Sequence, residues 1–414
     1  MLKNYIKISL KVLTRRKFFT FISLFAISFT LIILMVVTAV FDHIFGPHSP
    51  ETKTDRALGV YAVKYEGPDA ISTGPAGYGF LNRYVKTLPG VENVTIFSVF
   101  DTTYTFREGE KVKLFLKRTD GNFWDVFDFR FLEGAPYTSD DEKNGNFVAV
   151  INQATRDKVF GGESAVGKPL EIDGQRFRIA GVVANVPFLR FATFSDVWAP
   201  ISTSKTASYR NQNLRGEFQA LVLAKNKSDL PAIREEFQTR LANVEFPDTK
   251  QFNKAFGGLD TTFEQASRNI IPSSNFESQP GKLLAVIVLF MLLFMILPTI
   301  NLVNINVSRI LERAGEIGVR KAFGASSWTL VGQFIVENVV LTLLGGLLGF
   351  IGSLLVLDAI SRSNLIPYSE FQMNYRIFTY GLILALFFGV FSGVYPAWKM
   401  SRLHPVDALK GGVR

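Results

Sequence analysis

Cysteine is absent from the 414-residue sequence, and histidine occurs only three times. The missing cysteines exclude disulfides, thiolate metal sites, cysteine nucleophiles and a lipidated N-terminal cysteine. His43, His48 and His404 are too few and too scattered to form a histidine-based metal site. No catalytic constellation is visible in the sequence, so we expect no catalytic, metal-binding or cofactor-binding residue in this chain.

Acidic residues are scarce outside residues 42–281. That segment holds 28 Lys+Arg and 30 Asp+Glu, a net charge of −2. The remaining 174 residues hold 17 basic and 6 acidic residues, a net charge of +11. Because the excess positive charge surrounds hydrophobic segments, it indicates a membrane surface and lipid rather than nucleic acid as the partner.

Four long stretches contain almost no charged residue, in a chain that is 48% hydrophobic. They are residues 18–41, 283–308, 329–357 (interrupted only by Glu337) and 377–398. Each stretch is long enough for a helix to cross a bilayer. We therefore predict four transmembrane helices, in preference to buried core helices or a cleaved signal peptide at the N-terminus.

Lysine and arginine predict the orientation of these helices. Residues 1–17 hold six basic residues and no acidic one, which predicts a cytoplasmic N-terminus. The apolar residues there share one helical face and the lysines lie on the opposite face, so we expect an amphipathic helix along the cytoplasmic membrane surface, with a plain helical extension as the alternative. The predicted course then puts the following segments outside, inside, outside and inside in turn: 42–281, 309–328, 358–376 and 399–414.

The 240 residues of segment 42–281 are predicted to form an α/β domain outside the membrane. Residues 57–65 are predicted as a strand and residues 77–94 as a helix and turn, and a matching strand–helix unit occurs at residues 217–243. We expect an α/β lobe from about 55–100 and 215–270, with a β-rich lobe of about 101–214 inserted into it. The fold class is thus an α-helical membrane protein with a large extracytoplasmic α/β domain.

Residues 161–170, "GGESAVGKPL", resemble a phosphate-binding P-loop read from Gly162. The final position requires Ser or Thr to hold Mg²⁺, but Pro169 stands there and lacks a backbone N–H. The next residues predict a strand and an Asp173-Gly174 hairpin, whereas a P-loop opens a helix. We therefore expect this chain to bind no ATP, and ATP hydrolysis to occur in another subunit.

Small residues recur at steps of four in the third and fourth hydrophobic stretches. Such faces let helices approach closely, within one bundle or between two subunits. The expected helix-packing residues are Gly345, Gly349, Ser353, Gly389 and Gly393.

The predicted inner loop, residues 308–326, reads "SRILERAGEIGVRKAFGAS". Glu316 and Arg320 form a favourable i,i+4 pair, and Gly324 is suited to end a helix. Without further information, a solvated connector with the expected positive charge explains this loop equally well.

Three parts of the sequence resemble the FtsX-like, MacB-type ABC transporter permeases. The second hydrophobic stretch and the loop after it read "NLVNINVSRILERAGEIGVRKAFGAS". The outer segment contains "FWDVFDFRFLEG", "FVAVINQATRDKVFG" and "AVGKPLEIDGQRFRIAGVV", and the C-terminal end contains "GVYPAWKMSRLHPVDALK". The similarity covers essentially the whole chain in the same order.

This resemblance implies a dimeric permease of the bacterial inner membrane, with both termini cytoplasmic and an outer domain of porter-like and sabre-like lobes. It also implies a coupling helix that contacts a separate ATPase, which carries the ATP and Mg²⁺. The matching coupling residues are Glu312, Arg313, Glu316, Gly318, Arg320, Lys321 and Gly324. Only 17 residues precede the first hydrophobic stretch, so the ATPase is expected on a partner chain.

Several alternatives stay open at this point. The permease could form a homodimer or pair with a paralogue, and it could work with a periplasmic adaptor in efflux. A lipoprotein-releasing permease has the same predicted topology. A membrane receptor or sensor is the competing class, although neither the 20-residue inner loop nor the 16-residue tail offers an output domain.

Overall fold

The computed structural model describes residues 2–15, 17–211, 213–312, 319, 323, 326–363 and 365–401, and the chain divides into two compact units. The helical unit contains Met1–Asp42, Ala285–Leu365 and Glu370–Arg414. The sheet unit contains His43–Leu284 and the short segment Ile366–Ser369. The main part of the sheet unit closely follows the predicted outer segment, but its second segment is not evident from the sequence.

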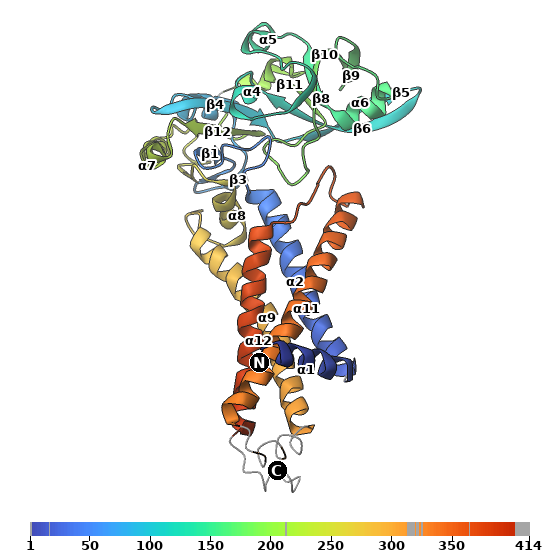
Figure 1. Cartoon of the computed structure of the whole chain (residues 1–414). Coiled ribbons are helices and arrows are strands. Elements are labelled where there is room, and N and C mark those ends of the chain that lie inside the picture. The colour runs from blue at the N-terminus through green and yellow to red at the C-terminus, as the bar shows by residue number, and fades with distance from the viewer. Residues whose placement is uncertain are drawn as a thin grey trace. The chain divides into compact units, whose positions relative to one another are not determined.

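Five helices carry most of the described part of the helical unit (Figure 1). They are α1 (Leu2–Arg15), α2 (Lys17–Phe45), α9 (Pro280–Glu312), α11 (Ser327–Arg362) and α12 (Tyr375–Ser401). Each of the four predicted membrane-spanning stretches lies inside one of these helices. Helix α1 corresponds to the predicted amphipathic N-terminal helix.

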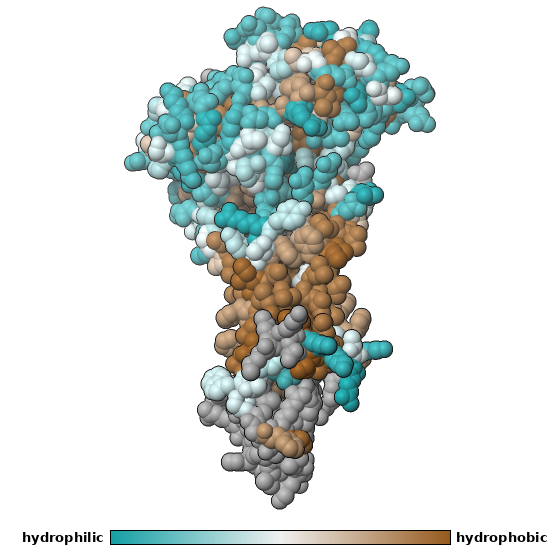
Figure 2. All heavy atoms as spheres, viewed as in Figure 1, coloured by the Kyte–Doolittle hydropathy of each residue, from teal (hydrophilic) through white to brown (hydrophobic). Residues whose placement is uncertain are grey.

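Two of the described helices are long and apolar enough to cross a membrane. They are Lys17–Phe45 and Val331–Arg362. In the most apolar 18 residues of each helix, only 22% and 33% of the residues, respectively, are buried. The space-filling view shows apolar side chains gathered over the long helices (Figure 2). The described apolar stretches of α9 and α12, Pro280–Phe294 and Tyr375–Phe391, are shorter than a full crossing. The structure thus supports two of the four predicted crossings by length.

Helix α11 packs closely on α2 through small residues. A Cβ added at Gly345 would lie 2.7 Å from Ile27 Cγ2, and one at Gly349 would lie 3.0 Å from Leu31 Cβ. Ser353 is fully buried on the same helix, and its hydroxyl donates to the carbonyl of Gly349 at 2.7 Å. At these positions the neighbour is another helix of the same chain, so a second subunit is not needed to fill the face.

Helix α12 joins the same packed group. A Cβ at Gly389 would lie 2.5 Å from Thr342 Oγ1 of α11, and one at Gly381 would lie 3.0 Å from Leu34 Cδ2 of α2. Gly393, the last predicted packing residue, lies within α12. Helices α2, α11 and α12 therefore form one packed body inside the helical unit.

A ten-stranded mixed sheet organises the sheet unit (Figure 1). Its strands follow the order β1-β12-β4-β6-β11-β8-β10-β7, with β5 paired to β6 and β9 paired to β10. Their bounds are β1 Ala57–Val60, β4 Val91–Ser98, β5 Asp101–Arg107, β6 Glu110–Thr119, β7 Phe131–Gly134, β8 Val148–Asn152, β9 Pro169–Ile172, β10 Gln175–Val183, β11 Val197–Pro200 and β12 Phe218–Ala224.

A second, three-stranded sheet has the order β13-β2-β3. Its strands are β2 (Val63–Glu66), β3 (Ile71–Gly74) and β13 (Lys254–Gly257). Residues 57–65, predicted as one strand, are therefore divided between two sheets. The α-helices of the unit are α3 (Tyr78–Tyr84), α4 (Phe123–Val126), α5 (Ser139–Asn144), α6 (Gln153–Phe160), α7 (Leu230–Ala242) and α8 (Thr262–Ile270).

Strands of both predicted lobes share the large sheet, because β4 and β6 are joined at the pair Phe97 and Thr119. The buried side chains nevertheless form separate clusters. One cluster comes mainly from residues 58–96 and 218–259, and two others come mainly from residues 97–198. A continuous backbone sheet thus carries more than one hydrophobic core.

Replacing Gly345 with Ala should destabilise the helical unit, because the added Cβ would meet Ile27 at 2.7 Å. Overpacking of this kind costs roughly 1–3 kcal/mol. Gly332→Ala is the matched control, since it lies on the same helix with no atom within 4 Å of its added Cβ. We expect thermal unfolding in detergent to show a lower Tm for Gly345→Ala only. A Tm for Gly345→Ala equal to that of Gly332→Ala would contradict the close contact.

Candidate functional site

The predicted coupling residues lie at the end of α9 and beyond it. Glu312 is the last residue of α9. The other six lie outside the described residues: Arg313, Glu316, Gly318, Arg320, Lys321 and Gly324. The coupling role of all seven therefore stays a prediction.

The P-loop-like segment forms a turn between a short helix and a hairpin. Helix α6 ends at Phe160, and Gly161 and Gly162 adopt left-handed φ angles of 66° and 84°. Pro169 begins strand β9, which pairs with β10 across the turn at Asp173 and Gly174. The predicted hairpin is confirmed, and a phosphate-binding loop would instead have to lead into a helix.

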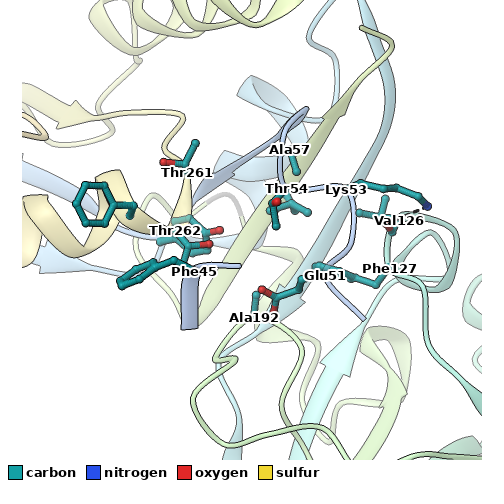
Figure 3. Close-up of a pocket in the computed structure, with 13 residues that line it drawn as sticks. Phe45, Glu51, Lys53, Thr54, Ala57, Val126, Phe127, Ala192, Thr261 and Thr262 are labelled. Atoms are coloured by element: carbon teal, nitrogen blue, oxygen red, sulfur yellow. Dashed lines mark hydrogen bonds between the residues drawn. The ribbon is translucent and has the colours of Figure 1, made fainter. Parts of the chain in front are cut away.

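A cavity of about 230 Å³ lies within the sheet unit, where the chain leaves α2. Its apolar lining includes Phe45, Val126 and Phe127. Phe45 and Thr262 lie on one side of the cavity, while Lys53 and Val126 lie on the other (Figure 3). A space of this size and lining suits a small, largely apolar group.

The charged residues of this cavity are held by neighbouring protein groups. The Glu51 carboxylate accepts hydrogen bonds from Arg190 Nη1 at 3.2 Å and from the Thr193 hydroxyl at 2.7 Å. The Lys53 ammonium lies 2.9 Å from Asp128 Oδ1 and also donates to the Asp125 carbonyl at 3.2 Å. Both charged residues of the cavity lining are therefore paired with other protein groups.

Lys117 is a fully buried charged residue next to the same region. Its ammonium donates to the carbonyls of Ser98 and Phe191, each at 3.1 Å, and it lies 5.1 Å from the centre of the Phe97 ring. Burial lowers the pKa of Lys117 to about 7, and the Glu51 carboxylate partly opposes this shift. Lys111 and Lys113 on the same strand are exposed. A lysine in this strand therefore does not by itself indicate burial, and the sequence gives no signal that distinguishes Lys117.

Metal-binding chemistry finds no support in the described part of the chain. No group of three or more His, Asp or Glu residues there lies close enough to hold a metal ion. The geometry of the cavity and of the buried lysine does not by itself identify a reaction.

Two known families match successive parts of the chain, which together make up 339 of its 414 residues. Residues 20–240 match the family described as MacB-like periplasmic core domain. Residues 288–405 match the family described as FtsX-like permease C-terminal. The first match includes most of the sheet unit, and the second includes helices α11 and α12.

Curated relatives carry related descriptions. The "Uncharacterized ABC transporter permease YknZ" of Bacillus subtilis is 23% identical over 341 residues, which cover 80% of this chain and 79% of the relative. The "Macrolide export ATP-binding/permease protein MacB" of Pasteurella multocida is 27% identical over 287 residues, which cover 69% of this chain but only 41% of the relative.

A solved structure of the periplasmic region of MacB from Actinobacillus actinomycetemcomitans also matches. It is 14% identical and covers 52% of this chain and 94% of its own, with a TM-score of 0.38.

The buried Lys117 predicts a rise in stability with increasing pH. The unfolded chain keeps the lysine proton up to a pKa of about 10.4, whereas the folded chain releases it above about 7. Between these values the unfolded state binds more protons, so the free energy of unfolding should rise by at most about 1.4 kcal/mol per pH unit.

Lys117→Met should flatten this rise, whereas Lys113→Met, an exposed change on the same strand, should keep it. The measurement is the thermal unfolding of the full chain at several pH values above 7, followed by the fluorescence of the tryptophans. Parallel pH profiles for wild type and Lys117→Met would show that another group is responsible.

Proposed function

Because the chain belongs to the family of ABC transporter permeases with a MacB-like periplasmic core domain and an FtsX-like C-terminal part, we propose that it is the permease subunit of a MacB-type transporter. In this role the helices transmit ATP-driven motion of a partner ATPase to the sheet unit, which drives export or extraction of a substrate. The observation that carries the proposal is the succession of both family matches along one chain.

The proposed topology has four crossings, α2, α9, α11 and α12, with both termini in the cytoplasm of a bacterium and the sheet unit outside. Two of these helices meet the length and apolarity of a full span, and the distribution of lysine and arginine supports the same orientation for all four. The near-neutral charge balance of the sheet unit agrees with an aqueous location.

Coupling to ATP hydrolysis is proposed at the loop between α9 and α11. This loop would present Glu312, Arg313, Glu316, Gly318, Arg320, Lys321 and Gly324 to the ATPase. The family of the chain supports an ATPase partner that would carry the ATP and Mg²⁺, and the MacB relative, whose name includes an ATP-binding part, supports it too. The permease itself would then hold no cofactor and catalyse no reaction.

A dimer is the proposed working form, made of two copies or of this chain and a paralogue. Helix α9 supports this proposal, because its apolar side chains are exposed around the helix. Leu289, Phe290 and Leu293 are between about half and two thirds exposed. Within a membrane such faces contact either lipid or another subunit, and close packing between subunits would bury them.

Export is the direction that the relatives favour, since one of them is described as a macrolide exporter. A periplasmic adaptor would be a further partner in that case. Purification of the chain from its native membrane with the ATPase bound would test the central claim. A chain that binds no ATPase under conditions that preserve its fold would overturn it.

Exchanging the charges of the loop pair should weaken ATPase binding. Glu316→Lys combined with Arg320→Glu keeps an i,i+4 pair but reverses the charges presented to the partner. We expect a loss of affinity of roughly tenfold or more, because charged contacts set register and partner choice. Asp358→Lys with Arg362→Glu is the matched control, since these residues form an exposed i,i+4 ion pair at the other end of α11. Equal ATPase binding by both double variants would rule out the proposed coupling loop.

The proposed topology predicts which introduced cysteines react from outside. The natural chain contains no cysteine, so every labelled thiol would be the introduced one. Lys225→Cys and Ser363→Cys, both at exposed positions, should react with a membrane-impermeant maleimide in spheroplasts. Lys11→Cys and Trp328→Cys should react only after the membrane is opened. Labelling of Lys11→Cys in sealed spheroplasts would reverse the proposed orientation.

A further inference from the structure

The loop between α11 and α12 contributes four residues to the sheet unit. Helix α11 ends at Arg362 and α12 begins at Tyr375, and Ile366–Ser369 between them belong to the sheet unit. The rest of that unit is one continuous segment, His43–Leu284, which follows α2 and leads into α9. The short loop is therefore a third chain connection to the sheet unit, beside the two provided by α2 and α9.

Tyr368 fixes this loop to a buried carboxylate. Its hydroxyl donates a hydrogen bond to Asp196 Oδ1 at 2.9 Å, and its ring lies 6.3 Å from the ring of Phe194. The neighbouring Pro367 carbonyl accepts from the Phe188 amide at 3.0 Å. Burial, and then the Asp196 charge, raises the pKa of Tyr368, which keeps the phenol in its neutral donor form.

Asp196 is itself held rigidly in the large sheet. Only 4% of its surface is exposed. Its Oδ2 accepts from the Phe115 amide at 2.9 Å, and its Oδ1 accepts from Asn152 Nδ2 at 2.9 Å. Since Phe115 lies in β6 and Asn152 ends β8, a force on the Tyr368 hydroxyl acts on two central strands.

The backbone of Tyr368 is also unusual for its residue type. Its φ angle is +58°, in the left-handed region that bulky residues seldom adopt. Such a conformation persists only where surrounding contacts determine it. The hydrogen bonds of Pro367 and Tyr368 are the contacts that do so here.

The segment that receives Tyr368 also holds the chain leaving α2. Arg190, which is 2% exposed, donates from Nη2 to the Gly46 carbonyl at 2.9 Å. It also binds Glu51, five residues further along. The Lys117 ammonium donates to the Phe191 carbonyl of the same segment. Residues 187–196 thus contact both the chain after α2 and the loop between α11 and α12.

We propose that Tyr368 is a positioning residue that latches the α11–α12 hairpin to the sheet unit at Asp196, so that movement of these two helices reaches the sheet directly. The proposal rests on the proposed permease function for its mechanical role, while the latch itself is a property of the chain alone. Movement of the helices would then reach the sheet unit through three chain connections: α2, α9 and the loop between α11 and α12.

The first experiment tests the latch in the full-length chain without ATPase. Tyr368→Phe removes only the hydroxyl, and Tyr65→Phe is the matched control, because its hydroxyl donates to the Leu214 carbonyl elsewhere in the sheet unit. Loss of a hydrogen bond to a charged group should raise the detached population of the loop roughly tenfold. Hydrogen exchange of the Phe188 amide should accelerate by that factor in Tyr368→Phe and stay unchanged in Tyr65→Phe. Unchanged exchange in Tyr368→Phe overturns the latch.

The second experiment tests transmission in the complex with the ATPase. Spin labels on Arg362→Cys and Lys225→Cys report the distance between the end of α11 and the sheet unit in an otherwise cysteine-free chain. We expect ATP to change this distance in wild type and in Tyr65→Phe. In Tyr368→Phe the ATPase rate should persist, but the distance distribution should broaden and lose its response to ATP.

The outcomes separate the two proposals. A full ATP response in Tyr368→Phe overturns the positioning role and leaves the permease function intact. No ATP response in the wild type overturns the proposed permease function and the transmission role with it, whereas the exchange experiment would still establish the latch.

Discussion

The close approach of α11 to α2 is the constraint on which the helical unit depends. Between apolar helices in lipid the hydrophobic effect gives little net attraction, so packing and hydrogen bonds must hold them together. Gly345 and Gly349 provide this packing by leaving room for Ile27 and Leu31. Helix α2 then continues without a break to Phe45, which already belongs to the sheet unit. Helix α2 is therefore a continuous chain connection from the packed helices to the first residues of the sheet unit.

The fold was predictable where a short-range pattern decides the structure. Runs of apolar residues allow few alternatives to long helices, and the predicted outer segment 42–281 differs little from the observed His43–Leu284. The Asp173-Gly174 hairpin follows from local turn chemistry. Residues 57–65 were predicted wrongly as one strand, because strand partners are chosen by tertiary packing. Here β1 pairs with β12 and β2 pairs with β13, so the chain changes sheets between them.

The functional features were predictable only in part, because they too depend on tertiary packing. The spacing of Gly345 and Gly349 signals close helix packing, but the sequence leaves open whether the same chain or a second subunit fills it. The burial of Lys117 depends on the carbonyls of two distant segments, which no local pattern reveals. Tyr368 lies 172 residues from Asp196, and a short loop containing one tyrosine carries no sign of that contact.

The buried polar groups of residues 187–196 explain why this segment is suited to connect moving parts. A charge removed from water destabilises the fold unless specific partners hold it, so each buried charge selects one conformation of its surroundings. Arg190 and Asp196 do this within the segment, and Lys117 of β6 donates to its Phe191 carbonyl. These hydrogen bonds weaken steeply when the donor–acceptor distance or angle changes, so they favour one arrangement of the segment. Residues 187–196 are thus tied by directional contacts to the chain after α2, to the α11–α12 loop and to β6 and β8, which is the connection that the proposed latch requires.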